Sequence, residues 1–462
     1  MGSRTLAARL DEAKVPAPGD DEVDLGEFFY GLEAEASREA ASRRCLRRAT
    51  LVGAGARDPG AETALFGRAI PGAHVFLNLA DPFCVVALGV QGSGKSHTVA
   101  TIVESCLMPV DEPADRPLVR LAKPMAVLAL HFGKSAQDAC ELAGLFRPAR
   151  ELATPHRVRP VVLVSPSFYK QRVAYYAGAD VEVHPLLFNW ASLGAAHLRA
   201  IMRLDDEKSQ QLYVSVALDL LRRYQQQGRL PDFDDFSAEI DGLCSSGTQA
   251  GPLKQRLQLL ESVLVEATRN ADNGLAAKHA PLAKLVGSGA LIVADLTDPL
   301  LSAADANGIF QVLLEQFRAC DVDAGKLVVL DEAHRYLSGD SGFASAVVDA
   351  VRVMRHEALR VVVSTQSPLT LPPEILELAS VAVLHAFHSS DWYAYLASKL
   401  AIPKDGFSTV RRLDPGDALV FAARADLAPA EEFEEQDGRD CAVIRIRRRL
   451  TRDLGASRRS AR

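Results

Sequence analysis

The sequence lacks three features that would place it in other classes of protein. No stretch of its 462 residues approaches the roughly 18 consecutive apolar residues of a membrane-spanning helix. Its first residues lack the apolar core of a secretory signal peptide. Its seven cysteines are scattered, odd in number and never in a C-x-x-C pair, which argues against a disulfide framework and against a zinc site. These absences predict a protein of the cytosol or nucleus with no membrane segment.

An excess of positive charge is also missing. The formal net charge is -7, with 48% hydrophobic and 24% charged residues, as in ordinary soluble globular proteins. A protein that coats nucleic acid usually has a basic balance. The composition therefore argues against non-specific coating, although it is compatible with a ring whose pore is locally basic.

One segment, in contrast, carries a complete phosphate-binding pattern. Residues 89–96 read GVQGSGKS and fit G-x-x-x-x-G-K-[ST] at every required position. The apolar run 84–88 before it predicts a buried strand, and residues 96–107 after it predict a helix, which is the context that the pattern needs. Lys95 would reach the β- and γ-phosphates of ATP, and the Ser96 hydroxyl would hold Mg²⁺. The predicted nucleotide contacts are Gly89, Gln91, Gly92, Ser93, Gly94, Lys95, Ser96 and His97.

Two downstream strand ends supply the groups that hydrolysis needs. The apolar run 326–330 ends in Asp331 and Glu332, which predicts a second Mg²⁺ ligand and a general base for the attacking water. The run 360–365 ends in Gln366, whose amide could contact the γ-phosphate or orient water. The alternatives are an acidic pair that opens a helix and a glutamine in a turn. Asp295 and Asp298 are further candidates near the metal, or capping residues of a turn.

The ordered motifs GVQGSGKS, KLVVLDEAH, VMRHEALR and VVVSTQSP resemble the HerA/FtsK branch of the P-loop ATPases, and HerA-like proteins most. The resemblance implies an α/β fold with a mostly parallel, RecA-like central sheet, helices on both faces and a helical insertion between the two nucleotide-binding motifs. It also implies a hexameric ring, commonly DNA translocation, and an arginine supplied to the neighbouring subunit's γ-phosphate. Arg355, in the predicted helix before the Gln366 strand, matches that arginine, and Arg352 and Arg360 are alternatives.

The chain also departs from the family. Only 88 residues precede Gly89, and the first forty do not resemble strands, so the β-barrel that precedes the loop in HerA proteins is not expected. The winged-helix domain of FtsK has no counterpart either. Two functions therefore stay open: an ATP-driven ring that moves DNA, and a nucleotide-gated scaffold that binds a protein partner without DNA.

Five segments are predicted along the chain: an acidic and then basic segment 1–63 that ends in a linker, 51–63; the first part of the ATPase core, 64–184; a helical insertion, 185–286; the second part of the core, 287–445; and a basic tail, 446–462. An edge strand is predicted at 75–77. Cations among aromatic residues, or clustered in the tail, could contact nucleic acid. These residues are Lys170, Arg172, Arg447 and Arg448. The alternatives are a tyrosine-rich loop packed on the insertion and a last strand with a frayed end.

Overall fold

The fold is described here from a computed structural model. It describes residues 49–53, 62–70, 72–110, 118–136, 138, 140–145, 158–204, 212–228, 231–243, 250–337, 341–426 and 440–451. All of these lie in one compact unit that spans Leu46–Arg462. The predictions for residues 1–48 and 452–462 lie outside the described residues. None of the described helices has both the length and the apolar character needed to cross a bilayer.

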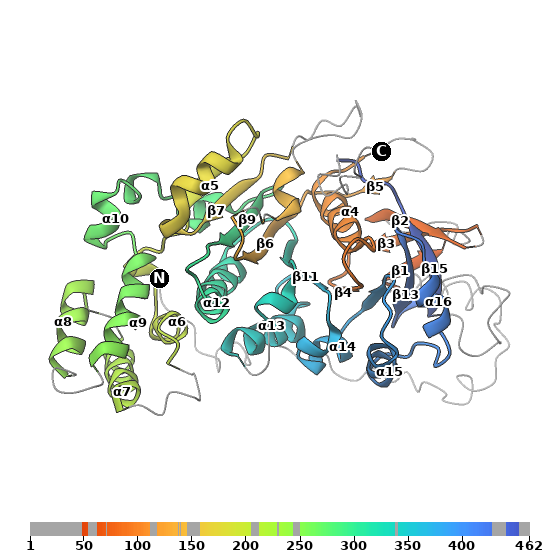
Figure 1. The fold of residues 1–462 in the computed structure, drawn as a ribbon. Helices are drawn as coiled ribbons and strands as arrows, with labels where there is room; N and C mark the ends of the chain where they lie inside the picture. Colours follow the sequence, from red (N-terminus) through yellow and green to blue (C-terminus); the bar gives the residue numbers. More distant parts are fainter. Residues whose placement is uncertain are drawn as a thin grey trace, which may run out of the picture. The chain divides into compact units, whose positions relative to one another are not determined.

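A sheet of 15 strands organises this unit (Figure 1). Eight neighbouring strands are parallel. In spatial order they are β12 (Val381–Leu384), β4 (Cys84–Leu88), β11 (Leu359–Thr365), β10 (Lys326–Leu330), β6 (Ala126–Gly133), β9 (Leu291–Thr297), β7 (Val161–Val164) and β8 (Glu182–Pro185). Strand β11, which ends before Gln366, pairs with both β4 and β10, so the strand that carries Gln366 lies directly beside the strand that leads into the phosphate loop. The register aligns Thr365 with Leu88 and Leu330 with Val363, so the three motif loops leave the sheet at one edge.

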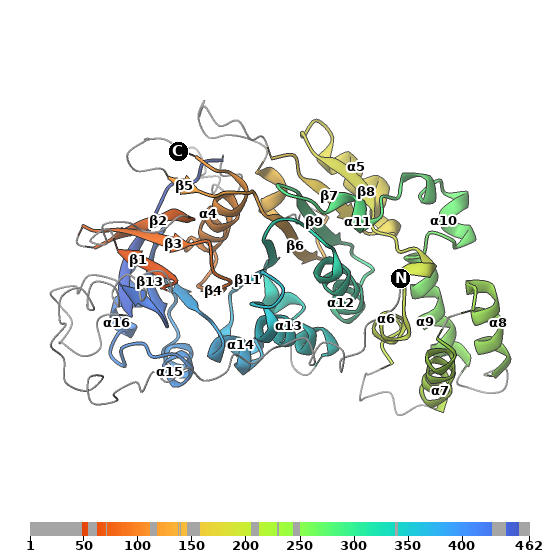
Figure 2. The same ribbon diagram turned by 180° about the vertical axis from the view of Figure 1, so that it is seen from behind.

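Both faces of the parallel region are buried, as its continuous apolar runs predict. On one face, Val85 and Ala87 of β4 pack in a core with α4 (Lys95–Leu107) and α5 (Tyr169–Tyr176). On the other face, Val86 and Leu88 share a core with another set of helices (Figure 2). These are α12 (Ala303–Ala319), α13 (Gly342–Val353), α14 (Pro373–Glu377) and α15 (Ser390–Lys399). The predicted α/β class with helices on both faces is confirmed.

A mainly helical insertion separates β8 from β9. Its helices are α6 (Ala195–Ile201), α7 (Leu212–Gln227), α8 (Phe233–Leu243), α9 (Ala250–Ser262), α10 (Thr268–Asp272) and α11 (Leu282–Leu285). Helix α6 packs closely on α12, because Gly308 leaves no side chain there: a Cβ at that position would lie 2.4 Å from the Ala200 carbonyl oxygen. The helical insertion predicted by the resemblance is therefore present, while the boundaries 185 and 286 stay predictions.

Beyond β12 the sheet becomes mostly antiparallel and combines strands from distant parts of the chain. In spatial order these are β13 (Asp417–Ala422), β15 (Cys441–Ile446), β2 (Thr63–Ala69), β3 (His74–Asn78) and β1 (Leu51–Gly53), with β14 (Ala425–Asp426) beside β1, β5 (Val119–Arg120) on β2, and α16 (Phe407–Arg412) before β13. Two predictions are wrong in this region. Residues 51–53 form a strand rather than a linker, and 75–77 belong to an interior strand that pairs with β1 and β2. Short apolar segments do not reveal partners so far away in the sequence.

Candidate functional site

The phosphate loop joins β4 to α4 in a tight turn that requires glycine. Gly89, Gly92 and Gly94 have positive φ angles of 155°, 77° and 115°. A Cβ at Gly89 would lie 2.6 Å from Ser93 Oγ, and one at Gly94 would lie 3.0 Å from the backbone nitrogen of Gly416. The predicted strand and helix on either side of the loop are confirmed, with the helix beginning at Lys95. The loop therefore precedes a helix N-terminus, where backbone N–H groups and the helix dipole favour an anion.

Lys95 lies inside this turn. Its Nζ donates a hydrogen bond to the Val90 carbonyl oxygen at 2.9 Å, and the residue is 4% exposed. Burial lowers the pKa of Lys95, and the negative charges of Glu332 and Asp331 oppose that shift. The ammonium group is therefore in the electrostatic field of both the predicted base, Glu332, and the predicted Mg²⁺ ligand, Asp331.

Asp331 follows β10 and is held by a histidine from the neighbouring strand β6. Its Oδ2 lies 3.0 Å from Nδ1 of His131, which is buried. Burial acts to raise the pKa of the Asp331 carboxyl group, but the hydrogen bond and charge of His131, the hydrogen bond of Cys140 and the charge of Arg335 together outweigh it, so this pKa lies below its ordinary value. The Asp331 carboxylate and the Ser96 hydroxyl of the loop both offer hard oxygen ligands, which suit Mg²⁺.

Glu332 and Gln366 meet at the same edge of the sheet. The Gln366 amide Nε2 donates to Oε2 of Glu332 at 2.8 Å, and Nδ1 of His334 lies 3.3 Å from the same oxygen. Glu332 has a left-handed backbone, with φ of 50°, which costs a non-glycine residue about 1–3 kcal/mol and is typical of functional sites. The predicted base and the predicted γ-phosphate sensor are thus in direct contact within one chain.

A buried histidine fixes the start of α4 against the antiparallel strands. His385, which follows β12, bonds through Nδ1 to the Asp417 carbonyl oxygen at 3.0 Å and through Nε2 to Thr98 Oγ1 at 2.9 Å. The carbonyl can only accept, so Nδ1 carries the proton and Nε2 accepts from the Thr98 hydroxyl. Burial lowers the pKa of His385 to about 4, and the charges of Lys95 and His97 act in the same direction.

This histidine predicts a loss of stability in mild acid. The pKa of His385 is about 4 in the folded protein and near the ordinary 6.5 in the unfolded chain, so the unfolded chain binds the proton first. Neutral His385 therefore contributes about 3 kcal/mol to the free energy of unfolding. This contribution is complete above pH 6.5 and is lost as the pH falls toward 4. Denaturant unfolding of wild type and His385→Gln across this range measures it. The free energy of unfolding of His385→Gln should depend less steeply on pH than that of wild type. Equal slopes for the two proteins would show that His385 does not cause the loss of stability.

Arg172 was predicted to contact nucleic acid, and this is wrong. It is fully buried on α5, where its guanidinium pairs with Asp295 and donates to the carbonyl oxygens of Ala136 and Asp138. A buried arginine satisfied in this way cannot reach a phosphate on a polymer outside. Asp295 is occupied by this ion pair, and Asp298 accepts from Ser165 and Ser167. Lys170, on the same helix, is exposed, so its predicted contact stays a prediction.

Arg447 was also wrongly predicted to contact nucleic acid. Its guanidinium bonds to Glu104 of α4 at 3.1 Å, to the Thr101 carbonyl oxygen and to Ser105 Oγ, and the residue is 8% exposed. Glu104 is itself fully buried. The Arg447 carbonyl oxygen lies 2.7 Å from Nε2 of His97, a predicted nucleotide contact that is thus bound to the C-terminal segment. Arg448 is exposed and remains a candidate.

The three arginines considered as a trans-acting residue differ in their surroundings. Arg355 is exposed, but it lies in the turn after α13 rather than inside a helix. Arg352 is exposed and lies 3.4 Å from Asp349. Arg360 is 4% exposed and donates to the carbonyl oxygens of Leu79, Ala80 and Ala358, so it cannot reach a neighbouring subunit.

Sequence reasoning missed His131, His334 and His385. A signal existed for His131, since it follows an apolar run, residues 126–130, and the carboxyl ends of parallel strands share one edge of a sheet. His334 stands three residues after Asp331, within the quoted motif. No local signal marked His385, because its role depends on Thr98 and on the carbonyl of Asp417.

No protein-family profile matches the chain, and no curated protein sequence does either. Solved structures do match. VirB4 of Thermoanaerobacter pseudethanolicus is 13% identical, with a TM-score of 0.55 over 84% of this chain and 97% of that chain. The plasmid coupling protein TrwB, in complex with a non-hydrolysable ATP analogue, is 13% identical, with a TM-score of 0.44 over 81% of this chain and 88% of that chain. At these identities the likeness concerns the fold alone, and of these two structures VirB4 has the TM-score above 0.5. The predicted resemblance is confirmed at that level: the chain has the fold of the HerA/FtsK-type P-loop ATPases.

Proposed function

We propose that this protein is an ATP hydrolase of the HerA/FtsK type that assembles into a homo-oligomeric ring and uses hydrolysis to move DNA. The observation that carries the hydrolase proposal is the convergence of the phosphate loop, Asp331, Glu332 and Gln366 at one edge of the sheet. The contact between Gln366 and Glu332 at 2.8 Å joins the γ-phosphate sensor to the base.

Each residue has a defined task in this proposal. The loop amides and Lys95 bind the phosphates, and the Ser96 hydroxyl and the Asp331 carboxylate hold Mg²⁺. When bound, Mg²⁺ neutralises charge on the β- and γ-phosphates. Glu332 accepts a proton from the attacking water, and Gln366 orients that water or contacts the γ-phosphate. His334, whose pKa is lowered by burial, lies beside Glu332, and its Nδ1 accepts a hydrogen bond from the Gln366 backbone nitrogen at 3.4 Å.

DNA stimulation of the ATPase tests the motor proposal. Turnover should rise when double- or single-stranded DNA is added at low salt, and the stimulation should weaken as salt is raised, because phosphate contacts release counterions. Steady-state phosphate release with DNA of several lengths measures this. An ATP turnover rate that does not change with DNA of any length at low salt would contradict the proposal of a DNA motor.

The second candidate is a nucleotide-gated scaffold for a protein partner, and one observation favours it. Arg172 and Arg447, two of the four proposed nucleic-acid contacts, are buried and paired. A scaffold would show slow basal turnover. The Glu332→Gln variant of a scaffold would still capture the protein partner, whereas the Lys95→Ala variant would not. Partner capture that neither substitution changes would contradict the scaffold function.

Arg355 can complete a site only in another subunit. It precedes β11 while Gln366 follows it, and the seven residues of that strand span about 23 Å. The turn that carries Arg355 is fixed by the neighbouring Glu357, which forms two hydrogen bonds of 2.7 Å with Arg318 of α12. An exposed arginine on a fixed turn suits donation across an interface.

Subunit mixing tests this trans arrangement. Arg355→Ala and Lys95→Ala should each be nearly inactive alone. Mixing them should restore activity, because about one interface in four then joins an intact loop to an intact arginine. ATPase assays of the mixture measure the rescue. A mixture no more active than its parts, in rings shown to exchange subunits, would contradict a trans role for Arg355.

A further inference from the structure

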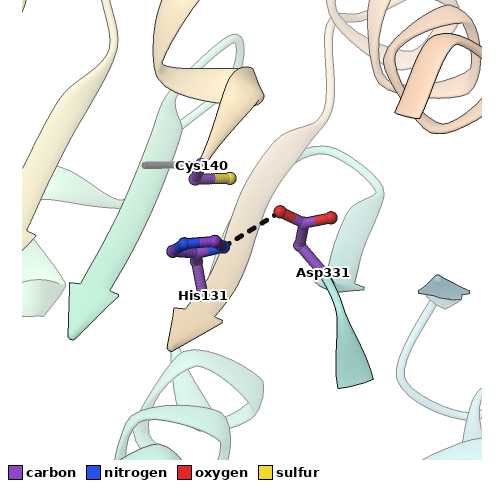
Figure 3. A group of neighbouring side chains, drawn as sticks. All are labelled: His131, Cys140 and Asp331. Carbon is purple, nitrogen blue, oxygen red and sulfur yellow. Dashed lines mark hydrogen bonds and ion pairs between the residues drawn. The ribbon is translucent and has the colours of Figure 1, made fainter. Parts of the chain in front are cut away.

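Three side chains of metal-binding type converge beside the proposed Mg²⁺ site. His131 lies near the end of β6, Asp331 follows β10, and Cys140 precedes a 3-10 turn at Glu141–Gly144. Figure 3 shows them close together although they come from three segments of the chain. One ligand atom from each lies within 4.8 Å of the other two. All three residues are buried: His131 is 3% exposed, Cys140 2% and Asp331 8%.

The donor atoms define the class of cation. Imidazole nitrogen, cysteine sulfur and carboxylate oxygen are the ligands of Zn²⁺, whereas Mg²⁺ selects oxygen. His131 Nδ1 and Asp331 Oδ2 are 3.0 Å apart. Two ligands of a tetrahedral Zn²⁺ with bonds of about 2.0–2.1 Å are about 3.3 Å apart. Small rotations of the two side chains would move His131 Nδ1 and Asp331 Oδ2 apart by a few tenths of an ångström, which is enough to admit such an ion between them.

The charges also suit a divalent cation. A Cys140 thiolate and the Asp331 carboxylate carry two negative charges, and His131 is a neutral ligand through one ring nitrogen. A divalent ion makes the buried complex neutral, which removes the cost of isolated charge in an apolar environment. The proton released is that of the Cys140 thiol, as metal binding by cysteine requires.

We propose that His131, Cys140 and Asp331 form a site for a thiophilic divalent cation of the Zn²⁺ class. It is distinct from the Mg²⁺ site but shares Asp331 with it. Binding of the cation withdraws that carboxylate from Mg²⁺, so occupancy stops ATP hydrolysis. This inhibition rests on the proposed function, while the binding itself does not.

Cobalt absorption tests the binding without nucleotide. Co²⁺ is titrated into the full-length, reduced protein, and a thiolate-to-cobalt absorption band that Zn²⁺ displaces is expected. Cys140→Ser should lose the band and bind Zn²⁺ about tenfold or more weakly. Cys320→Ser is the matched control, because Cys320 is a partly buried cysteine outside the cluster, and this variant should keep the band. If Cys140→Ser is poorly folded by circular dichroism, Cys140→Ala replaces it.

Two results would overturn the site. One is a wild-type protein without the band, and the other is an unchanged band in folded Cys140→Ser or Cys140→Ala. In either case His131 and Cys140 only hold Asp331 through hydrogen bonds. The wild-type spectrum decides the first result, so it does not depend on the folding of any variant.

The ATPase assay separates this inference from the proposed function. In excess Mg²⁺, Zn²⁺ should inhibit wild type, and Cys140→Ser should require about tenfold or more Zn²⁺ for the same fractional inhibition of its own rate. If the protein binds Co²⁺ through Cys140 but does not hydrolyse ATP, the cation site is supported and the proposed function is contradicted. An active ATPase without the cobalt band keeps the function and loses the site.

Discussion

Glu332→Gln is expected to bind ATP with nearly wild-type affinity and to hydrolyse it about 10²–10⁴ times more slowly. The amide keeps the size of the side chain, and its oxygen can still accept the hydrogen bond from Gln366 Nε2, so the site keeps its shape. The amide cannot take a proton from water, and general base catalysis contributes about this factor. The phosphates depend on the loop and Lys95, which the change leaves in place.

Two assays measure this separation of binding from chemistry. Calorimetric titration with ATP gives the affinity, and phosphate release gives the turnover. Glu374→Gln is a matched control, since Glu374 is exposed on α14 and contacts none of the site residues described above, and it should behave as wild type. Turnover close to wild type in Glu332→Gln would show that another group is the base.

Glu104→Ala is expected to lower the free energy of unfolding by about 3–5 kcal/mol. Glu104 is fully buried on α4 and accepts from Arg447 at 3.1 Å, from the backbone nitrogens of Leu450 and Thr451 at 2.9 Å, and from the Thr451 hydroxyl. Arg449 lies 3.8 Å from it. Burial lowers the pKa of Arg447, and the Glu104 charge opposes that shift, so alanine would leave a buried cation without its counter-ion.

Urea unfolding of wild type, Glu104→Ala and Glu374→Ala measures this effect. The exposed control should change the free energy of unfolding by about 0.5 kcal/mol or less. Glu104→Gln should lie between wild type and Glu104→Ala, because it can still accept hydrogen bonds but carries no charge. A Glu104→Ala protein as stable as the control would mean that the C-terminal segment does not depend on this pair.

The local sequence pattern was sufficient to predict the elements that are built from contiguous residues. The loop, its flanking strand and helix, and the strand ends at Asp331 and Gln366 depend on apolar runs and a short motif. The resemblance implied a mostly parallel central sheet, whereas apolar runs alone do not specify which strands are neighbours. The strand ends that carry Asp331, Glu332 and Gln366 were predicted from the sequence, but the contact between Glu332 and Gln366 was not.

The local sequence pattern did not predict ion pairs between residues that are far apart in the sequence. Arg172 and Arg447 belong to runs of cations that read as exposed surface, yet each is buried beside a carboxylate, Asp295 or Glu104, far away in the sequence. His131 and Cys140 were missed for a related reason, because a cluster built from a strand end and a neighbouring segment has no fixed spacing. Arg355 was placed in a helix, whereas α13 ends two residues before it.

The position of β15 has a consequence for how the chain folds during synthesis. This strand pairs with β2 on one side and β13 on the other, with Ile446 opposite Gly67 and Phe421 opposite Cys441. Strands β1–β3 are translated long before β15, and the pairing of β2 with β15, which connects them to β13, forms only when β15 has been translated. Contacts of such large sequence separation form slowly. Until then residues 67–69 of β2 lack their partner β15 and α4 lacks its contacts with Arg447, so the phosphate loop is translated long before the last segment that supports its helix.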